Sequence, residues 1–252
     1  MQAYGKNFAR VYNLRWNNFA QQVSPRLRAY YESTPLGQEN RTLLDVCCGT
    51  GQLALHFLDS GYTVTGLDLS PAMIEHARAN TAPYLVGGQA SFVQADAADF
   101  KVEGAFGLVV STFDALNHLP NLAALRGCFE SVYPALLPDG SFIFDLNTLT
   151  GLQRWNSIMI DDTPEMMIVN RGLVDYAANR AYMHISGFIR TSENLYERFE
   201  ETAYNTIFAL DDVRAALLSS GFRAVRFSRL QELHTALNEP ENESRIFVIA
   251  DK

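Results

Sequence analysis

Thr42-Leu-Leu-Asp-Val-Cys-Cys-Gly-Thr-Gly51 is the stretch of this 252-residue sequence that says most about its fold. Its first half, Thr42 to Val46, is a short apolar run that predicts a buried strand. Gly49 and Gly51 predict a tight turn, and the residues after them have the pattern of a helix that Gly61 stops. A strand, a glycine turn and a helix in this order present backbone N–H groups that can bind a carboxylate or a phosphate.

The alternation of strands and helices continues beyond this stretch. Further strands are expected at residues 62–67, 90–95, 106–111 and 141–146, and helices at residues 71–80 and 121–136. Ser70 and Pro71 favour a helix start, as N-cap and first helical residue. Because strands that alternate with helices form parallel sheets with right-handed crossovers, we predict an α/β fold with a doubly wound sheet of five parallel strands.

The two flanking regions have different patterns. In residues 4–31, aromatic residues spaced by three and four predict a helical stripe, and Pro25 is expected to open a second helix. The stripe consists of Phe8, Tyr12, Trp16 and Phe19. After Thr150, residues 166–189 and 195–203 have strand character, with a turn at Asn179-Arg180. Asp211 or Asp212 is then expected to cap a helix that ends at Gly221, and strands follow at residues 222–230 and 245–250, the last of them antiparallel.

Composition and charge exclude several classes of protein. The formal net charge is −8, whereas nucleic-acid-binding proteins usually show a basic surface, so nucleic acid is an unlikely partner and a small or cationic ligand is favoured. No apolar run approaches the roughly 20 residues that span a bilayer. Three cysteines without a CxxC pair indicate neither a disulfide framework nor a metal site. We therefore expect a cytoplasmic protein that has no metal and no membrane contact.

Three acids stand at the carboxyl ends of successive predicted strands, where open α/β sheets bind ligands. They are Asp45, Asp68 and Asp96. Asp68 follows Gly49 at about the 20-residue spacing that places an acid on a ribose hydroxyl pair. The alternative is that Asp45 and Asp96 only cap loops. The three acids together with the glycine turn favour a nucleoside-containing cofactor.

The glycine turn alone does not identify this cofactor. Gly49-x-Gly51-x-x-Ala54 also fits the dinucleotide fingerprint. Asp45 precedes the glycines, however, where a carboxylate would repel a pyrophosphate but could meet an ammonium group. Asp96-Ala97 suits an adenine amino group. Both details favour S-adenosylmethionine over NAD.

Five segments resemble the class I S-adenosylmethionine-dependent methyltransferases, and small-molecule members in particular. They are residues 43–51, 64–73, 92–96, 104–111 and 137–144. The resemblance covers about residues 41–150 and implies a Rossmann-like fold. Cys47 departs from it, because many members carry glycine there, and its side chain is expected to narrow the pocket slightly.

The resemblance implies the residues that hold the methionine portion, the ribose, the adenine and the sulfonium of S-adenosylmethionine, or of its product S-adenosylhomocysteine. These residues are Asp45, Cys47, Gly49, Gly51, Asp68, Leu69, Met73, Asp96, Ala97, Ser111 and Thr112. Met73 is also a plausible core residue.

The loop Thr112 to His118 is expected to face the transferred methyl group. His118 resembles the histidine of N-methyltransferases that act on nucleotide-linked aminosugars, and Tyr12 resembles their lid tyrosine, so both are candidate catalytic residues. The alternatives are that His118 only caps the loop and that Tyr12 only packs. Asp114 and Asn117 are lesser candidates. Asp145 and Asn147 share a strand face, but we favour no metal site there.

We predict methyl transfer from S-adenosylmethionine to the nitrogen, oxygen or carboxylate of a small-molecule acceptor. The alternatives are a catalytically silent binder of S-adenosylmethionine or S-adenosylhomocysteine and, less favoured, an NAD-linked oxidoreductase. The chain is expected to be a monomer or a homodimer. It is interpreted as one domain, with a helical lid at 1–38, a cofactor-binding core at 41–150, an insertion shaping the acceptor pocket at about 152–205, and a C-terminal helix and strands at 206–252 that complete the sheet.

Overall fold

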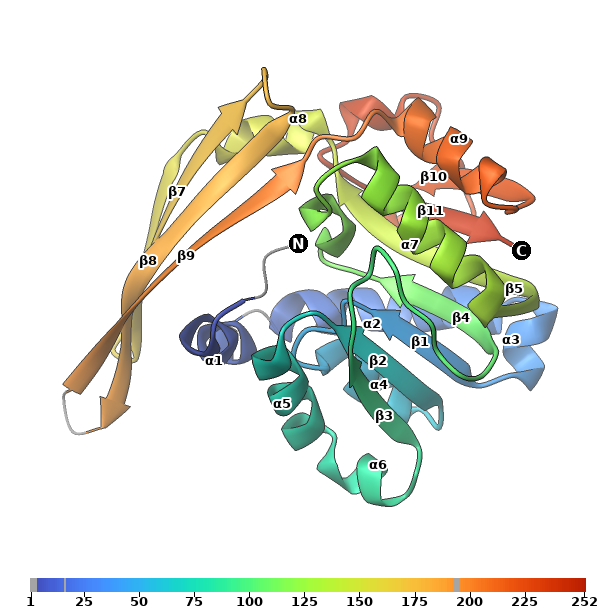
Figure 1. Cartoon of the computed structure of the whole chain (residues 1–252), viewed down its shortest axis with the longest axis horizontal. Helices are drawn as coiled ribbons and strands as arrows, with labels where there is room; N and C mark the ends of the chain where they lie inside the picture. Colours follow the sequence, from blue (N-terminus) through green and yellow to red (C-terminus); the bar gives the residue numbers. More distant parts are fainter. Residues whose placement is uncertain (1–3, 16, 193–194) are drawn as a thin grey trace.

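The structure is a computed structural model that describes residues 4–15, 17–192 and 195–252. It has a central sheet with helices on both faces and a second sheet that extends beside this body (Figure 1). Trp16, predicted as part of the aromatic stripe, lies outside the described residues.

The central sheet has seven strands in the order β10-β11-β5-β4-β1-β2-β3. The strands are β1 Thr42–Val46, β2 Thr63–Asp68, β3 Ala90–Gln94, β4 Phe106–Ser111, β5 Leu136–Asn147, β10 Ala224–Ser228 and β11 Arg245–Asp251. β1 pairs in parallel with β2 and β4, while β11 is antiparallel to β5 and β10. The predicted mainly parallel sheet with an antiparallel last strand is confirmed.

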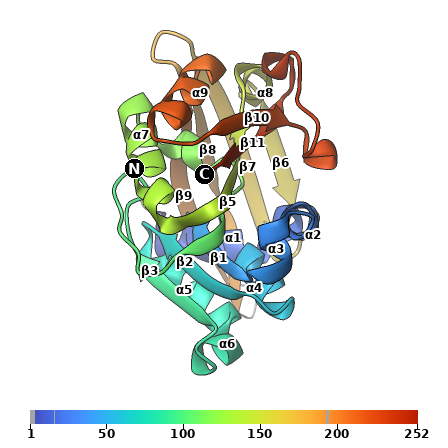
Figure 2. The ribbon, with the colours of Figure 1, turned by 90° about the vertical axis from the view of Figure 1, so that its right-hand side faces the viewer.

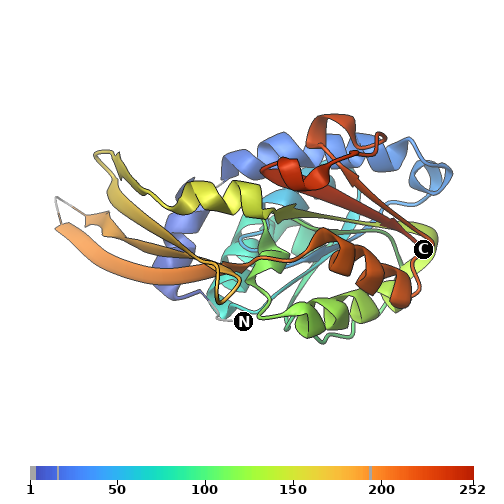
Figure 3. The same ribbon diagram turned by 90° about the horizontal axis from the view of Figure 1, so that it is seen from above.

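The helices cover both faces of this sheet, as the view from above shows (Figure 3). They are α1 Lys6–Arg15, α2 Asn17–Glu32, α3 Pro35–Glu39, α4 Gln52–Asp59, α5 Pro71–Asn80, α6 Ala82–Val86, α7 Leu122–Ala135, α8 Leu149–Leu152 and α9 Leu210–Ser219, with 3-10 turns η1 Ala115–His118, η2 Gln153–Trp155, η3 Leu230–Glu232 and η4 Pro240–Asn242. Successive residues of β1 enter opposite cores. Leu44 packs with α7 and α9, and Leu43 packs with α2 and α4. In the part of the chain that the structure describes, no helix is long and apolar enough to cross a membrane.

The second sheet is antiparallel and has the order β6-β7-β8-β9. Its strands are β6 Ile158–Asp162, β7 Met166–Asp175, β8 Arg180–Ser192 and β9 Leu195–Thr206. It forms a long arm beside α1, and its strands run behind the central sheet in Figure 2. Phe8 and Val11 of α1 pack in one core with Ile168, Met183 and Ile185 of the arm. This contact places the N-terminal helix between the two sheets.

Two predicted helix starts were wrong. Pro25 does not open a helix but lies inside α2, in the turn where Ser24 Oγ donates a hydrogen bond to the Ala20 carbonyl at 2.6 Å. The neighbouring Val23 and Leu27 are fully buried, and this packing outweighs the cost of an interior proline. Neither Asp211 nor Asp212 caps α9, whose N-cap position is Ala209. Both acids lie in the first turn, where the helix dipole favours negative charge.

Candidate active site

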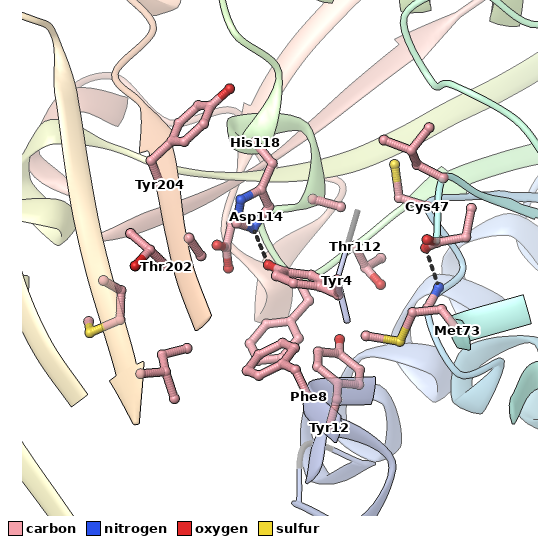
Figure 4. A pocket seen from close by; sticks show the side chains of 18 of the residues that line it. Tyr4, Phe8, Tyr12, Cys47, Met73, Thr112, Asp114, His118, Thr202 and Tyr204 are labelled. Carbon is pink, nitrogen blue, oxygen red and sulfur yellow. Dashed lines mark hydrogen bonds between the residues drawn. The ribbon is translucent and has the colours of Figure 1, made fainter. Parts of the chain in front are cut away.

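A cavity of about 410 Å³ lies at the carboxyl ends of β1, β2 and β4, and α1 and the arm form its other walls. It joins residues from the cofactor motifs with residues of the N-terminal helix and the loop after β4 (Figure 4). The predicted site residues that line it are Tyr12, Cys47, Gly49, Asp68, Leu69, Met73, Ala97, Thr112 and His118. A smaller cavity of about 30 Å³ adjoins it between α2 and β1, and is lined by Asp45 together with Tyr12, Cys47 and Thr112.

Three predicted cofactor residues are not among the described lining residues of either cavity: Gly51, Asp96 and Ser111. Gly51 has a φ of 76° and packs on α5, so that a Cβ atom there would come within 3.0 Å of the Ala77 Cβ. The Asp96 carboxylate accepts a hydrogen bond from the Ala98 N–H at 2.9 Å, as a loop cap does. Ser111 is fully buried at the end of β4. Gly51 and Asp96 thus shape turns beside the cavities, while Ser111 is the last residue of β4.

Asp68 ties the glycine turn to the end of β2. Its carboxylate accepts hydrogen bonds from the Gly49 N–H and the Ser70 N–H, both at 2.9 Å. Burial raises the pKa of Asp68, and these backbone donors oppose the shift. Gly49 has a φ of 54° and lies under the Tyr12 ring, since a Cβ atom there would be 3.5 Å from Tyr12 Cε1. That distance is an ordinary contact, so it is the left-handed backbone conformation that suits glycine to this position.

Asp45 is a buried acid without a full set of partners. It is 2% exposed, and no donor among the described residues reaches its Oδ2 atom. Burial, followed by repulsion from Asp68, raises the pKa of Asp45 to about 8. Burying a charged group is costly unless it is paired. A ligand ammonium in the smaller cavity would supply the missing partner, so this site fits the amino group of S-adenosylmethionine.

The chain near Tyr4 closes one side of the main cavity. The Tyr4 hydroxyl lies 3.3 Å from His118 Nε2, and the two rings meet edge to face. Ser70 Oγ donates to the Tyr4 carbonyl at 2.8 Å, and the Gly5 N–H donates to the Glu201 carboxylate at 3.3 Å. This segment thus links α5 to the arm. Tyr4 was not predicted as a site residue from the sequence, although it lies four residues before Phe8 and so continues the spacing of the aromatic stripe.

The loop after β4 has an unusual backbone. Phe113 and Asp114 both have left-handed conformations, with φ values of 65° and 49°. Such residues cost of order 1–3 kcal/mol each and persist where the surroundings hold them. Asp145 of β5 holds them here, because its carboxylate accepts the Phe113 N–H at 2.6 Å and the Asp114 N–H at 2.9 Å. Arg245 of β11 forms ion pairs with Asp145 and with Asp114.

This loop presents His118 to the cavity, beside Tyr4 and Asp114 (Figure 4). Burial lowers the pKa of His118, and the nearby Asp114 carboxylate opposes that shift. Near neutral pH the imidazole is therefore mainly uncharged and able to accept a proton. The arrangement can position a nucleophile and take its proton, as general base catalysis requires.

Asn117 and Asn147 make structural contacts instead. Asn117 Nδ2 donates to the carbonyls of Asn147 and Thr206, at 3.2 and 3.0 Å, and the Asn147 N–H donates to Asn117 Oδ1 at 2.9 Å. These bonds join the loop to β5 and β9. Within the described ranges, no three His, Cys, Asp or Glu residues are grouped so that they could hold a metal ion.

Comparison with known proteins identifies the motif-bearing part of the chain. Residues 43–140 match a family model described as a methyltransferase domain. A putative methyltransferase of Geobacillus sp. strain WCH70 is 25% identical over 239 residues, which cover 94% of this chain and 92% of that protein. A dTDP-3-amino-3,4,6-trideoxy-alpha-D-glucopyranose N,N-dimethyltransferase of Streptomyces venezuelae is 31% identical over 146 residues, or 56% of this chain and 58% of that protein.

The fold is also that of a solved structure. An S-adenosylmethionine-dependent methyltransferase from Clostridium acetobutylicum superposes with a TM-score of 0.79 at 20% identity, and the match covers 97% of both chains. At this identity the likeness is one of fold. It extends over the N-terminal helices, the central sheet and the arm.

Proposed function

We propose that this chain is a class I S-adenosylmethionine-dependent methyltransferase and that it methylates a small molecule held in the 410 Å³ cavity. The match of residues 43–140 to a methyltransferase domain and the likeness to an amino-sugar N,N-dimethyltransferase support this proposal. The observation that carries this proposal is the continuity of the cavity. One space is lined by Gly49 and Asp68 on the cofactor side and by His118 and Asp114 on the other. A cofactor and an acceptor bound there would share one site.

The proposed cofactor contacts follow from the two cavities. Asp45 would pair with the ammonium of the methionine portion of the cofactor, and the backbone of the turn at Gly49 would lie against this same portion. The Asp68 carboxylate would accept hydrogen bonds from the ribose hydroxyls. The adenine would lie among Leu69, Met73 and Ala97, and the sulfonium near Cys47 and Thr112. Gly51, Asp96 and Ser111 would support these contacts from outside the cavities.

When bound, S-adenosylmethionine supplies a methyl group whose bond to a positively charged sulfur breaks as the acceptor bonds to the carbon, with the electron pair left on the sulfur. His118, uncharged near neutral pH, would take the proton that the acceptor loses. The Tyr4 hydroxyl would orient the imidazole, and Tyr12 would cover the glycine turn. Positioning of this kind is worth roughly 7–11 kcal/mol in well-oriented reactions.

A nitrogen acceptor is favoured over oxygen and carboxylate acceptors. The Streptomyces venezuelae relative is named as an N,N-dimethyltransferase of an amino sugar. The lone pair of an amine is a good nucleophile once the amine is deprotonated, and an uncharged His118 beside the cavity is suited to that proton transfer.

We further propose that the chain is one domain whose segments have different roles. The parts are a lid at residues 1–38, a cofactor-binding core at 41–150, an acceptor-shaping arm at about 152–205 and a sheet-completing segment at 206–252. The partners are a small-molecule acceptor and, at most, a second copy of the chain. A nucleic-acid substrate is disfavoured, because the protein has a formal net charge of −8.

The first experiment measures S-adenosylhomocysteine release from S-adenosylmethionine with pooled acceptors. The pools contain amines and aminosugars, phenols and alcohols, carboxylic acids, or RNA. We expect release with the amine pool. Release with RNA alone would contradict the small-molecule proposal, and tight binding of S-adenosylhomocysteine without release from any pool would favour the silent-binder alternative.

Cofactor binding is expected to release a proton from Asp45. The pKa of this carboxyl is about 8 in the free protein, so it is mostly protonated at pH 6.5, whereas a carboxylate paired with an ammonium is ionised. The affinity for S-adenosylhomocysteine should therefore rise by up to about tenfold per pH unit below pH 8 and level off above it. Calorimetry at pH 6.5 in buffers of different ionisation enthalpy should detect close to one released proton.

The matched variant for this measurement is Asp45→Asn. It keeps the shape of the side chain but has no proton to release, so its affinity should be lower and independent of pH over this range. A wild-type affinity that does not change between pH 6.5 and 8 would exclude Asp45 as the partner of the ammonium.

A further inference from the structure

The charges that face the acceptor side of the cavity do not cancel. Among the described residues that line it, Arg245 is the only Lys or Arg. Its guanidinium pairs with two carboxylates, Asp114 in the cavity wall and Asp145, whose side chain is 0% exposed, behind it. One cation between two anions leaves a net negative charge at this wall. No cationic group of these lining residues remains free to bind a phosphate.

Asp114 is placed so that this negative charge faces the ligand. It occupies the N-cap position of η1, yet its side chain makes no capping hydrogen bond. Arg245 donates to Oδ1 at 2.7 Å, while Oδ2 receives no hydrogen bond from the described residues. Figure 4 shows the carboxylate beside His118, directed toward the space between η1 and the arm. The residue is 7% exposed, so water screens its charge only weakly.

The remaining walls add apolar surface and one more acceptor atom. Met183 and Ile185 of β8 and Trp155 of η2 also line the cavity. Asn170 of β7 also lines it, and its buried Oδ1 atom has no hydrogen-bond partner among the described residues. A buried acceptor without a donor is costly, so a ligand that brings N–H groups is favoured.

We infer that Asp114 determines the acceptor class: it selects a cationic amine with an apolar body and disfavours an acceptor that carries a phosphate. This inference rests on the proposed function and narrows it. The acceptor enters as an ammonium ion that pairs with Asp114 Oδ2. It gives one proton to the neutral His118 imidazole, and the freed lone pair is the nucleophile. The apolar body lies against Met183 and Ile185.

The test uses the full chain saturated with S-adenosylhomocysteine and three probes, whose binding is measured by calorimetry at pH 7. Benzylamine is the cationic apolar probe, benzyl alcohol is its neutral counterpart, and dTDP carries the phosphates of a nucleotide-linked acceptor. We expect benzylamine to bind about tenfold or more tightly than benzyl alcohol, and dTDP to bind most weakly. Benzylamine binding no tighter than benzyl alcohol, or dTDP binding most tightly, would overturn the inference.

Asp114→Asn should remove the preference for benzylamine, because the amide keeps the side-chain shape and tolerates the left-handed backbone. The matched control is Asp139→Asn. Asp139 also has a left-handed backbone, with a φ of 62°, and also pairs with an arginine, Arg223, but it is not a described lining residue of either cavity. The control should keep the wild-type preference. A preference that survives in Asp114→Asn would overturn the inference.

The probe ranking in the wild-type protein tests the inference without any variant, should Asp114→Asn fail to fold. Failure of the proposed function is recognised separately, as a lack of S-adenosylhomocysteine binding or of its release with any acceptor pool. A chain that releases S-adenosylhomocysteine but prefers neutral or phosphate-bearing acceptors would refute the inference alone.

Discussion

Replacing His118 by Asn is expected to lower kcat by about 10²–10⁴-fold, the usual contribution of a positioned general base. Asn can still accept a hydrogen bond from the Tyr4 hydroxyl, but it cannot take a proton from the acceptor. The affinity for S-adenosylhomocysteine should not change, because His118 is not one of the proposed cofactor contacts. Single-turnover release of S-adenosylhomocysteine, with an acceptor from the active pool, measures the effect.

The pH dependence of kcat also tests whether His118 acts as a base. Burial holds the pKa of His118 below its ordinary value of 6.5, so the imidazole is the free base above that pH. The wild-type kcat should be level above pH 6.5 and fall as the pH drops through the lowered pKa. The His118→Asn variant should lose this acid limb.

His234→Asn is the matched control for His118→Asn. His234 also contacts a tyrosine ring, that of Tyr30, and a hydroxyl, that of Ser33, but is not among the described lining residues of either cavity. It should leave kcat and its pH profile unchanged. A His118→Asn variant that retains nearly full activity would show that positioning alone is sufficient and that His118 is no base.

The strands of the central sheet could be predicted from sequence because their signals are local. Thr42–Val46 and Phe106–Ser111 have the predicted bounds, since both are apolar runs buried on two faces and followed by small or turn-forming residues. Strand β6, Ile158–Asp162, was not predicted. It is an edge strand whose residues are mostly exposed, and it is defined by its pairing with β7, which periodicity does not reveal.

The candidate site divides in the same way. The hydrogen bond between Asp68 and the Gly49 N–H lies within one strand-turn-helix-strand unit, and its motif indicated both residues. The ion pairs that hold the loop after β4, in contrast, join distant parts of the chain. Arg245 lies 131 residues from Asp114 and 100 residues from Asp145. Nothing in the spacing of these residues predicts that β11 inserts beside β5 and brings the three together. Asp114 was only a lesser candidate for this reason.

Replacing Arg245 by Met is expected to lower the free energy of unfolding by about 3–5 kcal/mol, because it leaves the buried Asp145 carboxylate without its counter-ion. Met retains much of the apolar volume of the arginine stem. The main change is therefore the loss of the positive charge. Urea unfolding monitored by circular dichroism measures the loss. Arg223→Met is the matched control, since Arg223 pairs with Asp139 where the two side chains are 62% and 74% exposed. A surface pair of this kind contributes only about 0–1 kcal/mol.

The dependence of this loss on pH separates charge from packing. Burial already raises the pKa of Asp145, and Arg245 opposes that shift, so removing the arginine raises the pKa further. An acid whose pKa is higher in the folded state binds protons on folding, and the variant should therefore recover stability relative to wild type as the pH falls toward 5. The double variant Arg245→Met with Asp145→Asn should recover part of the loss at pH 7. The Arg245 guanidinium also lies over the Phe19 ring, 4.9 Å from its centroid, and Phe19 stacks on Phe113 with ring centroids 4.5 Å apart. A loss of stability that stays constant with pH would assign the stabilisation to this ring packing. The left-handed loop would then be held by aromatic contacts and not by the buried ion pair.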